Sequence, residues 1–500
     1  MKCKIIPTAA FVLISAYNVI SQDSKTNTEE SIQSIKKRGY SIEACYRLAD
    51  EFLNSTTEQR KGIPYYEYII ANENEPKPEV YQKLAKCYYF NGTYELAVKL
   101  QNEYILKEKN GKLKKEAKTE LEKYENAMNI ASRPIDLIMV NLGPQVNSKS
   151  AEINPYVSAS ENLLVYSSNR GNDFNIYVSK KPNNASNWDQ SKLAGNLVNT
   201  INDEFVAGLS ANGSNLFVHY NQVSGFEDIN ESMRSKGLFR ELEDPGNKIN
   251  STYREEGACI SKNQDTLYFA SDRPGGLGGF DIYFSLRLPD GNWGPPINMG
   301  QPVNTAFDEN YPNLSQNGRK LYFASKGHGS IGGYDLFYST FNALANSWSA
   351  PVNLGFPINN AYDNKNISFT ENERYAYISS TDKNSLGDFD IYKIIFLKNE
   401  PDLLIIKGQV YITENELSVP FNSTNENLSI TVFKGNKIFG IYALDKRNNT
   451  FILALPPGEF VLELKSDNFE KVRKKIKIDE NYYSDNQRVV KINLVNRKSK

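Results

Sequence analysis

A fivefold internal repeat constrains this chain more than any other feature of its sequence. In each repeat a glycine is followed four residues later by an asparagine and, eleven residues beyond it, by a serine or threonine. The five asparagines are Asn147, Asn199, Asn250, Asn304 and Asn359. Their separations of 52, 51, 54 and 55 residues are too regular for chance. Each repeat ends in a run such as Phe280-Asp281-Ile282-Tyr283.

The repeat predicts a ring of small antiparallel sheets. Each copy contains strand-length apolar runs separated by Gly, Asn, Asp and Pro. One such sheet cannot bury both faces alone, but a radial array can, so we expect a five-bladed β-propeller over residues 131–397. The fifth copy stops after its third strand, near Phe396. We expect the strand-like segment 135–142 to supply the missing outer strand and close the ring, since closure removes exposed edges.

The repeat resembles the TolB-type, WD40-like propeller repeat. The similarity lies in four runs, namely Ser-Asn-Arg at 168–170, Ser-Asp-Arg at 271–273, Gly-Gly-Phe-Asp-Ile-Tyr at 278–283 and Trp-Gly-Pro-Pro-Ile-Asn at 293–298. The resemblance covers the whole repeat region and implies the propeller fold. The second copy departs most, because His219-Tyr220-Asn221 replaces the Ser-Asp-Arg run and an insert follows at 231–242.

Six charged side chains recur at positions that should lie on one face, near the central channel. Four acids precede the innermost strands and two arginines follow second strands, namely Glu152, Glu204, Glu255, Glu309, Arg170 and Arg273. In the fifth copy Asn364 occupies the acidic position, with Asp363 beside it. One interpretation is a polar ring that binds a cation, peptide or glycan. The other is a set of salt bridges and turn hydrogen bonds that hold the blades.

The sequence offers little for catalysis. The two histidines, His219 and His328, have no nucleophile motif beside them. The run Gly275–Gly279 lacks a following Lys-Ser/Thr and recurs near Gly332, so it predicts a hairpin and not a phosphate loop. Propeller glycosidases work with carboxylates alone, but no carboxylate pair stands out from the repeat. We expect no enzyme, no metal and no cofactor.

Residues 22–130 predict paired helices. Apolar side chains recur there at helical spacing in two units offset by 36 residues. In the second unit Tyr81, Leu84, Ala85 and Tyr88 resemble the tetratricopeptide pattern, whose period is about 34 residues. The resemblance implies a small platform for protein contact. A purely structural cap is the alternative.

The N-terminus predicts export. Lys2 and Lys4 precede an apolar run, so residues 1–21 are expected to form a secretory signal that is too short for a membrane span. No later stretch approaches 18 consecutive apolar residues, so we expect no membrane span. The 58 basic and 59 acidic side chains nearly cancel, which argues against nucleic acid as a partner.

The C-terminal part predicts a separate β domain over residues 403–495. Lys-Gly-Gln-Val at 407–410 and Leu-Pro-Pro-Gly at 455–458 resemble the carboxypeptidase-regulatory-like, transthyretin-type β-sandwich. The fold class that we expect is therefore multidomain α plus all-β, with helical repeats, a five-bladed propeller and a sandwich.

This order of parts resembles the multidomain envelope proteins of Bacteroidota that are associated with type IX secretion and gliding. Those proteins usually end in an OmpA-like peptidoglycan-binding domain, for which residues 1–500 leave no room. The resemblance implies an exported, periplasmic or outer-membrane-associated scaffold without catalytic activity. Its expected partners are envelope or secretion-machinery proteins, and a cell-wall polymer reached through a partner. A glycan- or peptide-binding sensor is the second hypothesis, and a cryptic propeller hydrolase is the third.

Overall fold

The computed structural model describes two stretches of the chain, residues 32–397 without 172, 183–186, 222–226, 344 and 382–384, and residues 404–494 without 415–416, 422–427, 446–448, 456–457, 466–468 and 479–489. The predicted signal segment 1–21 lies outside the described residues. Apart from short loops, one compact unit contains the helices and the sheets up to Ile395, and a second unit begins at Phe396. Among the described residues, no helix is both long and apolar enough to cross a bilayer.

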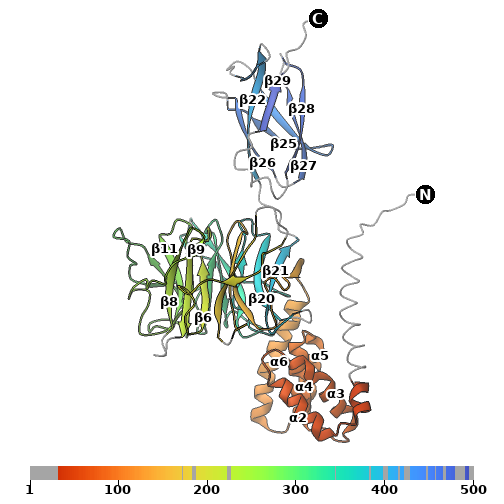
Figure 1. The fold of residues 1–500 in the computed structure, drawn as a ribbon. Helices are drawn as coiled ribbons and strands as arrows, with labels where there is room; N and C mark the ends of the chain where they lie inside the picture. Colours follow the sequence, from red (N-terminus) through yellow and green to blue (C-terminus); the bar gives the residue numbers. More distant parts are fainter. Residues whose placement is uncertain are drawn as a thin grey trace, which may run out of the picture. The chain divides into compact units, whose positions relative to one another are not determined.

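The helical region consists of antiparallel pairs (Figure 1). Its elements are α2 (Ile42–Leu53), the 3-10 helix η1 (Gln59–Gly62), α3 (Ile63–Asn72), α4 (Pro78–Phe90), α5 (Tyr94–Lys107) and α6 (Gly111–Ala131). Ser41 caps α2 by accepting a hydrogen bond from the Ala44 amide, and Asn110 caps α6 in the same way. Pro78 begins α4, where proline costs no hydrogen bond. Small buried residues such as Ala85 and Ala97 let α4 and α5 approach closely.

Five sheets follow, which we call blades one to five. Blade one is β2 (Glu152–Val157), β3 (Leu163–Ser168), β4 (Asn175–Lys180) and β5 (Lys192–Leu193). Blade two is β6 (Glu204–Leu209), β7 (Asn215–Asn221), β8 (Glu227–Ser235) and β9 (Leu238–Phe239). Blade three is β10 (Glu255–Ile260), β11 (Thr266–Ser271), β12 (Asp281–Leu286) and β13 (Ile297–Asn298). Blade four is β14 (Glu309–Leu314), β15 (Lys320–Ser325), β16 (Asp335–Asn342), β17 (Ser347–Trp348) and β18 (Val352–Asn353). Blade two keeps the common strand order, and the insert at 231–242 lengthens β8 to Ser235 and contains β9.

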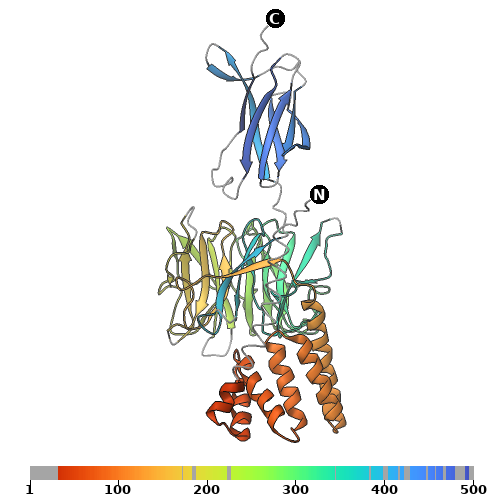
Figure 2. The same ribbon diagram turned by 90° about the vertical axis from the view of Figure 1, so that its right-hand side faces the viewer.

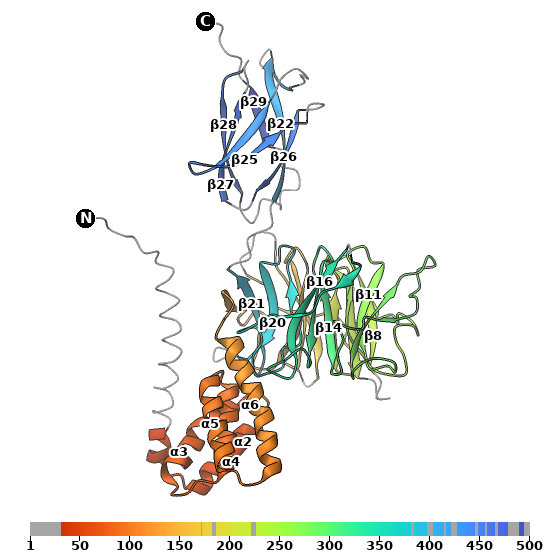
Figure 3. The same ribbon diagram turned by 180° about the vertical axis from the view of Figure 1, so that it is seen from behind.

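Blade five combines strands from the two ends of the repeat region. It contains β19 (Ser368–Phe369), β20 (Tyr375–Ser380), β21 (Asp390–Phe396) and, outside β21, the early strand β1 (Leu137–Asn141). The segment 135–142 thus lies where closure of the ring requires an outer strand. On the other side, the inner strand of blade one packs on blade five, and the Val157 amide donates to the Ser368 hydroxyl at 2.9 Å. Figure 3 shows β20 and β21 beside the blade that contains β14 and β16.

The repeated asparagine joins each blade to the next. The Asn304 side chain accepts a hydrogen bond from the Ile282 amide at 2.9 Å and donates to the Ile282 carbonyl at 2.9 Å. The other four asparagines bond in the same way to Ile391, Ile176, Ile229 and Leu336. Each asparagine therefore supplies an acceptor to a buried backbone amide and donates to the carbonyl of the same residue, and in blade three the Met299 amide also donates to that Ile282 carbonyl at 3.0 Å. This requirement explains the regular spacing of the asparagines.

The C-terminal unit consists of two four-stranded sheets around one apolar core (Figure 3). The first holds β22 (Leu404–Glu414), β23 (Leu417–Pro420), β26 (Thr450–Leu455) and β29 (Val490–Leu494). The second holds β24 (Ser429–Lys434), β25 (Lys437–Ala443), β27 (Gly458–Lys465) and β28 (Val472–Ile478). Val410, Leu453 and Leu462 are among the buried residues between them. Pro456 and Pro457 of the predicted turn lie outside the described residues.

Cys45, Cys87 and Cys259 are buried and unpaired. Burial raises the pKa of both Cys87 and Cys259 to about 12, so neither is a thiolate at neutral pH. All three cysteines are therefore buried core residues.

Candidate functional site

The predicted acids of the propeller are fully buried and held within their own blades. Glu152, at the start of β2, accepts hydrogen bonds from the hydroxyls of Ser148 at 2.6 Å and Ser168 at 2.7 Å. Arg170 lies 2.9 Å from the same carboxylate and also donates to the Val146 carbonyl at 2.6 Å. The structure thus brings each predicted arginine to the acid of its own blade, and these contacts account for the recurring positions by architecture. Ligand binding by these residues stays a prediction.

Blades three and four repeat this arrangement with one replacement. In blade three Arg273 lies 2.9 Å from Glu255 and donates to the Ile249 carbonyl at 2.5 Å. In blade four no arginine is present at this position, and His328 Nε2 donates to the equivalent Val303 carbonyl at 2.9 Å. His328 therefore serves as the structural substitute for an arginine. Sequence reasoning missed this role because the histidine lies one residue later than the arginines do.

In the described part of blade two, which omits residues 222–226, most of this network is missing. Among the described residues Glu204 accepts hydrogen bonds only from the amide and hydroxyl of Thr200, and no described group bonds to its Oε2. Tyr220 lies opposite Glu204 as Ser168 lies opposite Glu152, so the predicted alignment of His219 with the serine was wrong by one residue. Because desolvation is not fully compensated, burial raises the pKa of Glu204.

Blade five uses the amide that the sequence predicted for the acidic position. The Asn364 side chain accepts a hydrogen bond from the Asn360 amide at 2.9 Å, and its backbone amide donates to the Tyr334 carbonyl at 2.7 Å. Asp363 beside it accepts from the Tyr334 amide at 3.0 Å. Asn364 therefore forms the hydrogen bond of this turn without placing a charge there.

The propeller channel is narrow where the inner strands end. A space of about 20 Å³ is lined by residues at or just beyond the ends of all five inner strands, most of them apolar, with Lys262 and Gln316 among the polar ones. This volume is about that of one water molecule. A peptide or sugar does not fit into this part of the channel.

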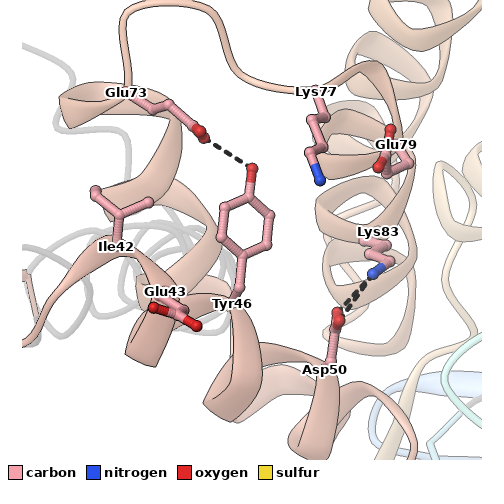
Figure 4. Close-up of a pocket in the computed structure, with 8 residues that line it drawn as sticks. All are labelled: Ile42, Glu43, Tyr46, Asp50, Glu73, Lys77, Glu79 and Lys83. Carbon is pink, nitrogen blue, oxygen red and sulfur yellow. Dashed lines mark hydrogen bonds and ion pairs between the residues drawn. The ribbon is translucent and has the colours of Figure 1, made fainter.

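A larger groove lies in the helical region, between α2 and α4 (Figure 4). Its volume is about 530 Å³, and it is open to solvent on one side. It is lined by Ile42, Glu43, Tyr46, Asp50, Glu73, Lys77, Glu79 and Lys83. The sequence predicted a contact platform in this region but assigned none of these residues to it. Six of them are charged, and the spacing of apolar residues gives no information about charged positions.

Two contacts fix the walls of the groove. The Tyr46 hydroxyl donates to Glu73 at 2.7 Å, and Lys83 Nζ lies 2.7 Å from Asp50 (Figure 4). Burial and the hydrogen bond to Glu73 raise the pKa of Tyr46, so the phenol stays protonated and keeps its donor. Lys77 lies over the Tyr46 ring, 6.0 Å from its centre. These two contacts fix the orientation of the Tyr46 ring in the groove.

The remaining acids give the groove a negative surplus. Four carboxylates and two ammonium groups line it. Among the described residues, neither Glu43 nor Glu79 has a hydrogen bond or an ion pair. A ligand that brings positive charge to these two carboxylates is therefore favoured over an acidic one.

The helical region also packs on the propeller, a contact that no sequence pattern predicted (Figure 2). Ile331 and Ala361, from the loops of blades four and five, are buried in the helical core. The Tyr89 hydroxyl of α4 donates to the Ile331 carbonyl. The Tyr362 ring lies 5.1 Å from that of Phe90. One end of the propeller is therefore partly covered by α4.

No protein-family model matches this sequence, and no curated protein matches it. Solved structures similar to it include TolB from Acinetobacter baumannii, at 15% identity and a TM-score of 0.34 over 50% of this chain. The match spans 56% of the length of that TolB. A thermostable family-43 glycoside hydrolase is similar at 15% identity and a TM-score of 0.37, over 56% of this chain and 95% of its own. A putative TolB from Agrobacterium tumefaciens is similar at 15% identity and a TM-score of 0.31, over 53% of this chain and 92% of its own.

Proposed function

We propose that this chain is a non-catalytic protein-protein interaction scaffold of the cell envelope, linked to type IX secretion or gliding machinery. The helical region is a tetratricopeptide-type platform, the five blades form a TolB-type propeller, and the C-terminal unit is a carboxypeptidase-regulatory-like sandwich. The envelope location rests on the predicted signal segment and on the resemblance stated above.

The α2–α4 groove is the observation that carries this proposal. It combines a volume of about 530 Å³, a tyrosine held upright and two exposed acids that lack partners among the described residues. Tyrosine is the kind of residue that anchors protein contacts, because it offers a large rigid surface with a polar tip. The recognised partner segment is an extended or helical peptide with a lysine or arginine beside an apolar residue. Recognition of such a peptide needs no chemistry from the propeller.

The buried propeller acids support the same proposal. Glu152, Glu255 and Glu309 are all fully buried and bound by serine or threonine hydroxyls. A catalytic carboxylate must reach its substrate. These three serve as internal braces of their blades instead.

Charge reversal in the groove tests the proposal. The double variant Glu43→Lys, Glu79→Lys should lose the partner in a cross-linking pull-down from cell envelopes, because the new lysines repel a basic segment. A control with the same change of net charge is Glu95→Lys, Glu122→Lys, at exposed positions of α5 and α6. Equal capture of the same envelope proteins by both double variants would contradict the groove as the binding site.

A further inference from the structure

The propeller surface that contacts α4 has equivalents in other repeats of the chain. In blade four the turn before β16 presents Ile331, and the loop before β19 presents Ala361 and Tyr362. One repeat earlier, the turn before β12 presents Leu277, and the loop before β14 presents Ala306 and Phe307. We call these the covered surface and the open surface.

The two turns have the same backbone geometry. The amides of Leu277 and Gly278 donate to Asp281 at 2.5 and 3.1 Å, and the amides of Ile331 and Gly332 donate to Asp335 at 3.0 Å each. Each turn therefore presents one apolar side chain and its carbonyl at the same place in its blade.

The following loops sit against these turns in the same way. A Cβ at Gly278 would lie 1.8 Å from the Phe307 carbonyl oxygen, and one at Gly332 would lie 2.2 Å from the Tyr362 carbonyl oxygen. Only glycine permits this approach, so the pairing of turn and loop is built into both copies. The loop that carries Phe307 therefore packs on the Leu277 turn in the same way as the loop that carries Tyr362 packs on the Ile331 turn.

The two copies differ in what covers them. Ile331 is 0% exposed under α4, and its carbonyl accepts the Tyr89 hydroxyl. Leu277 is 50% exposed and Phe307 is 59% exposed. Within the described part of the chain, no donor reaches the Leu277 carbonyl. An exposed leucine and an exposed phenylalanine, at positions whose equivalents one repeat later contact α4, mark an interaction surface.

We propose that the open surface of Leu277, Ala306 and Phe307 docks a helix of another protein that carries adjacent aromatic residues. Its tyrosine donates to the Leu277 carbonyl, as Tyr89 donates to Ile331. The inference rests on the proposed scaffold role and adds a second binding surface, distinct from the α2–α4 groove.

One substitution between the copies favours a foreign helix over a second copy of this chain. On the covered surface Phe356 packs against Tyr94, with ring centres 6.2 Å apart. The equivalent residue of the open surface is Gln301. A second copy would place Tyr94 on this amide, and its own Tyr89 and Phe90 are already buried against blades four and five. The partner protein carries a polar residue at the place that Tyr94 of α5 occupies on the covered surface.

A third copy of the turn provides a natural control. Leu386 occupies the turn before β21 and is 48% exposed, and the Leu386 amide donates to Asp390 at 2.7 Å. The loop that packs on this turn, through Gly387, has Ser150 where the others have an aromatic residue. This third surface lacks the aromatic half and should not dock the helix.

Site-specific photo-cross-linking tests the proposal in the full chain. Phe307 is replaced by p-benzoylphenylalanine in cells that make the protein naturally, and the cross-linked peptide is sequenced by mass spectrometry. We expect one partner, joined through a helix that carries adjacent aromatic residues. Adding Leu277→Asp should lower the adduct yield at least about tenfold, because it buries a charge in the contact. Leu386→Asp should leave the yield unchanged.

Other results would overturn the proposal. These are no adduct, an adduct with a second copy of this chain, a cross-link to a non-helical segment, or a yield insensitive to Leu277→Asp. Tryptophan fluorescence checks that each variant is folded, since Trp188, Trp293 and Trp348 all lie in the propeller. Loss of this adduct with intact capture through the α2–α4 groove would remove the second surface and leave the scaffold role standing.

Discussion

At the scale of single residues, the propeller shows how one position is used differently from blade to blade. Glu255 has an arginine and two serines around it, whereas among the described residues Glu204 has only Thr200 and one oxygen without a partner. A buried carboxylate is stable when its charge is paired and costly when it is not. The same residue type should therefore contribute to stability with opposite sign in blades two and three.

This contrast predicts opposite effects of one substitution. Glu255→Gln should lower the free energy of unfolding by about 2 kcal/mol, because Arg273 then lacks a charged partner. Glu204→Gln should leave it unchanged or raise it, because it removes a poorly compensated charge. Denaturant titrations followed by tryptophan fluorescence measure both, since all three tryptophans are in the propeller. Equal losses in the two variants would contradict the assignment.

Residue-scale electrostatics also predict a pH dependence for the C-terminal unit. Burial raises the pKa of Glu463, but hydrogen bonds from Lys471, Arg473 and Lys465 outweigh it and hold the pKa at about 2. A carboxyl whose pKa is lowered in the folded state stabilises that state above its unfolded pKa. This stabilisation is lost as pH falls from about 4.5 towards 2.

Glu463→Gln should therefore cost about 1 kcal/mol at pH 7, a small value because its cationic partners are largely exposed to solvent. The cost should vanish near pH 2. Hydrogen exchange of β27 and β28 reports this unit without a tryptophan. Glu459→Gln, at an exposed position of β27, is the control and should have no effect at either pH. A pH-independent loss in Glu463→Gln would refute the ion-pair explanation.

At the scale of elements, the linker asparagines connect the blades. Each supplies a donor and an acceptor to a backbone position of the preceding blade, as Asn304 does for Ile282. The spacing of these asparagines, read with the strand pattern, was enough to place the blades and the extra strand near residues 135–142. The sequence did not reveal that His328 replaces an arginine, because only the geometry shows that it reaches the Val303 carbonyl, which is equivalent to the Val146 carbonyl bonded by Arg170.

Removal of one linker amide should weaken the whole ring. Asn304→Ala leaves the buried amide of Ile282 without its acceptor, while the Ile282 carbonyl keeps the Met299 amide, and the loss should cost about 2 kcal/mol in the free energy of unfolding. Asn292→Ala changes an exposed turn and is the matched control. Thermal unfolding followed by tryptophan fluorescence compares the two. A similar shift in both would show that the linker bonds are dispensable.

At the scale of the whole molecule, the helical region and the propeller share a core. Ile331 and Ala361 belong to the helical cluster, and Tyr362 packs on Phe90 and donates to Gln59 at 3.2 Å. No pattern in the sequence predicts that the helices pack on the Ile331 turn, because the Leu277 turn has a similar sequence. Tertiary contact alone decides which copy of the surface is covered, and only coordinates reveal it.

The shared core predicts coupled unfolding. In Tyr362→Ala the helical signal in circular dichroism should be lost about 5–10 °C before the tryptophan signal of the propeller, whereas the two coincide in the unaltered chain. Phe307→Ala, at the equivalent exposed position, should leave them coincident. Coincident transitions in Tyr362→Ala would show that the contact does not couple the two parts.

The placement of β1 beside β21 has a consequence for biosynthesis. Asn147 and Ile391, whose bonds join the first blade to the last, are 244 residues apart. β1, the first strand of the ring to be synthesised, therefore cannot pair with β21 until almost the entire ring has left the ribosome. Until then β1 has no strand to pair with, and contacts of such long sequence separation form slowly. A chaperone that shields nascent sheet edges should bind arrested chains in which β21 is absent and release those in which β21 has left the ribosome.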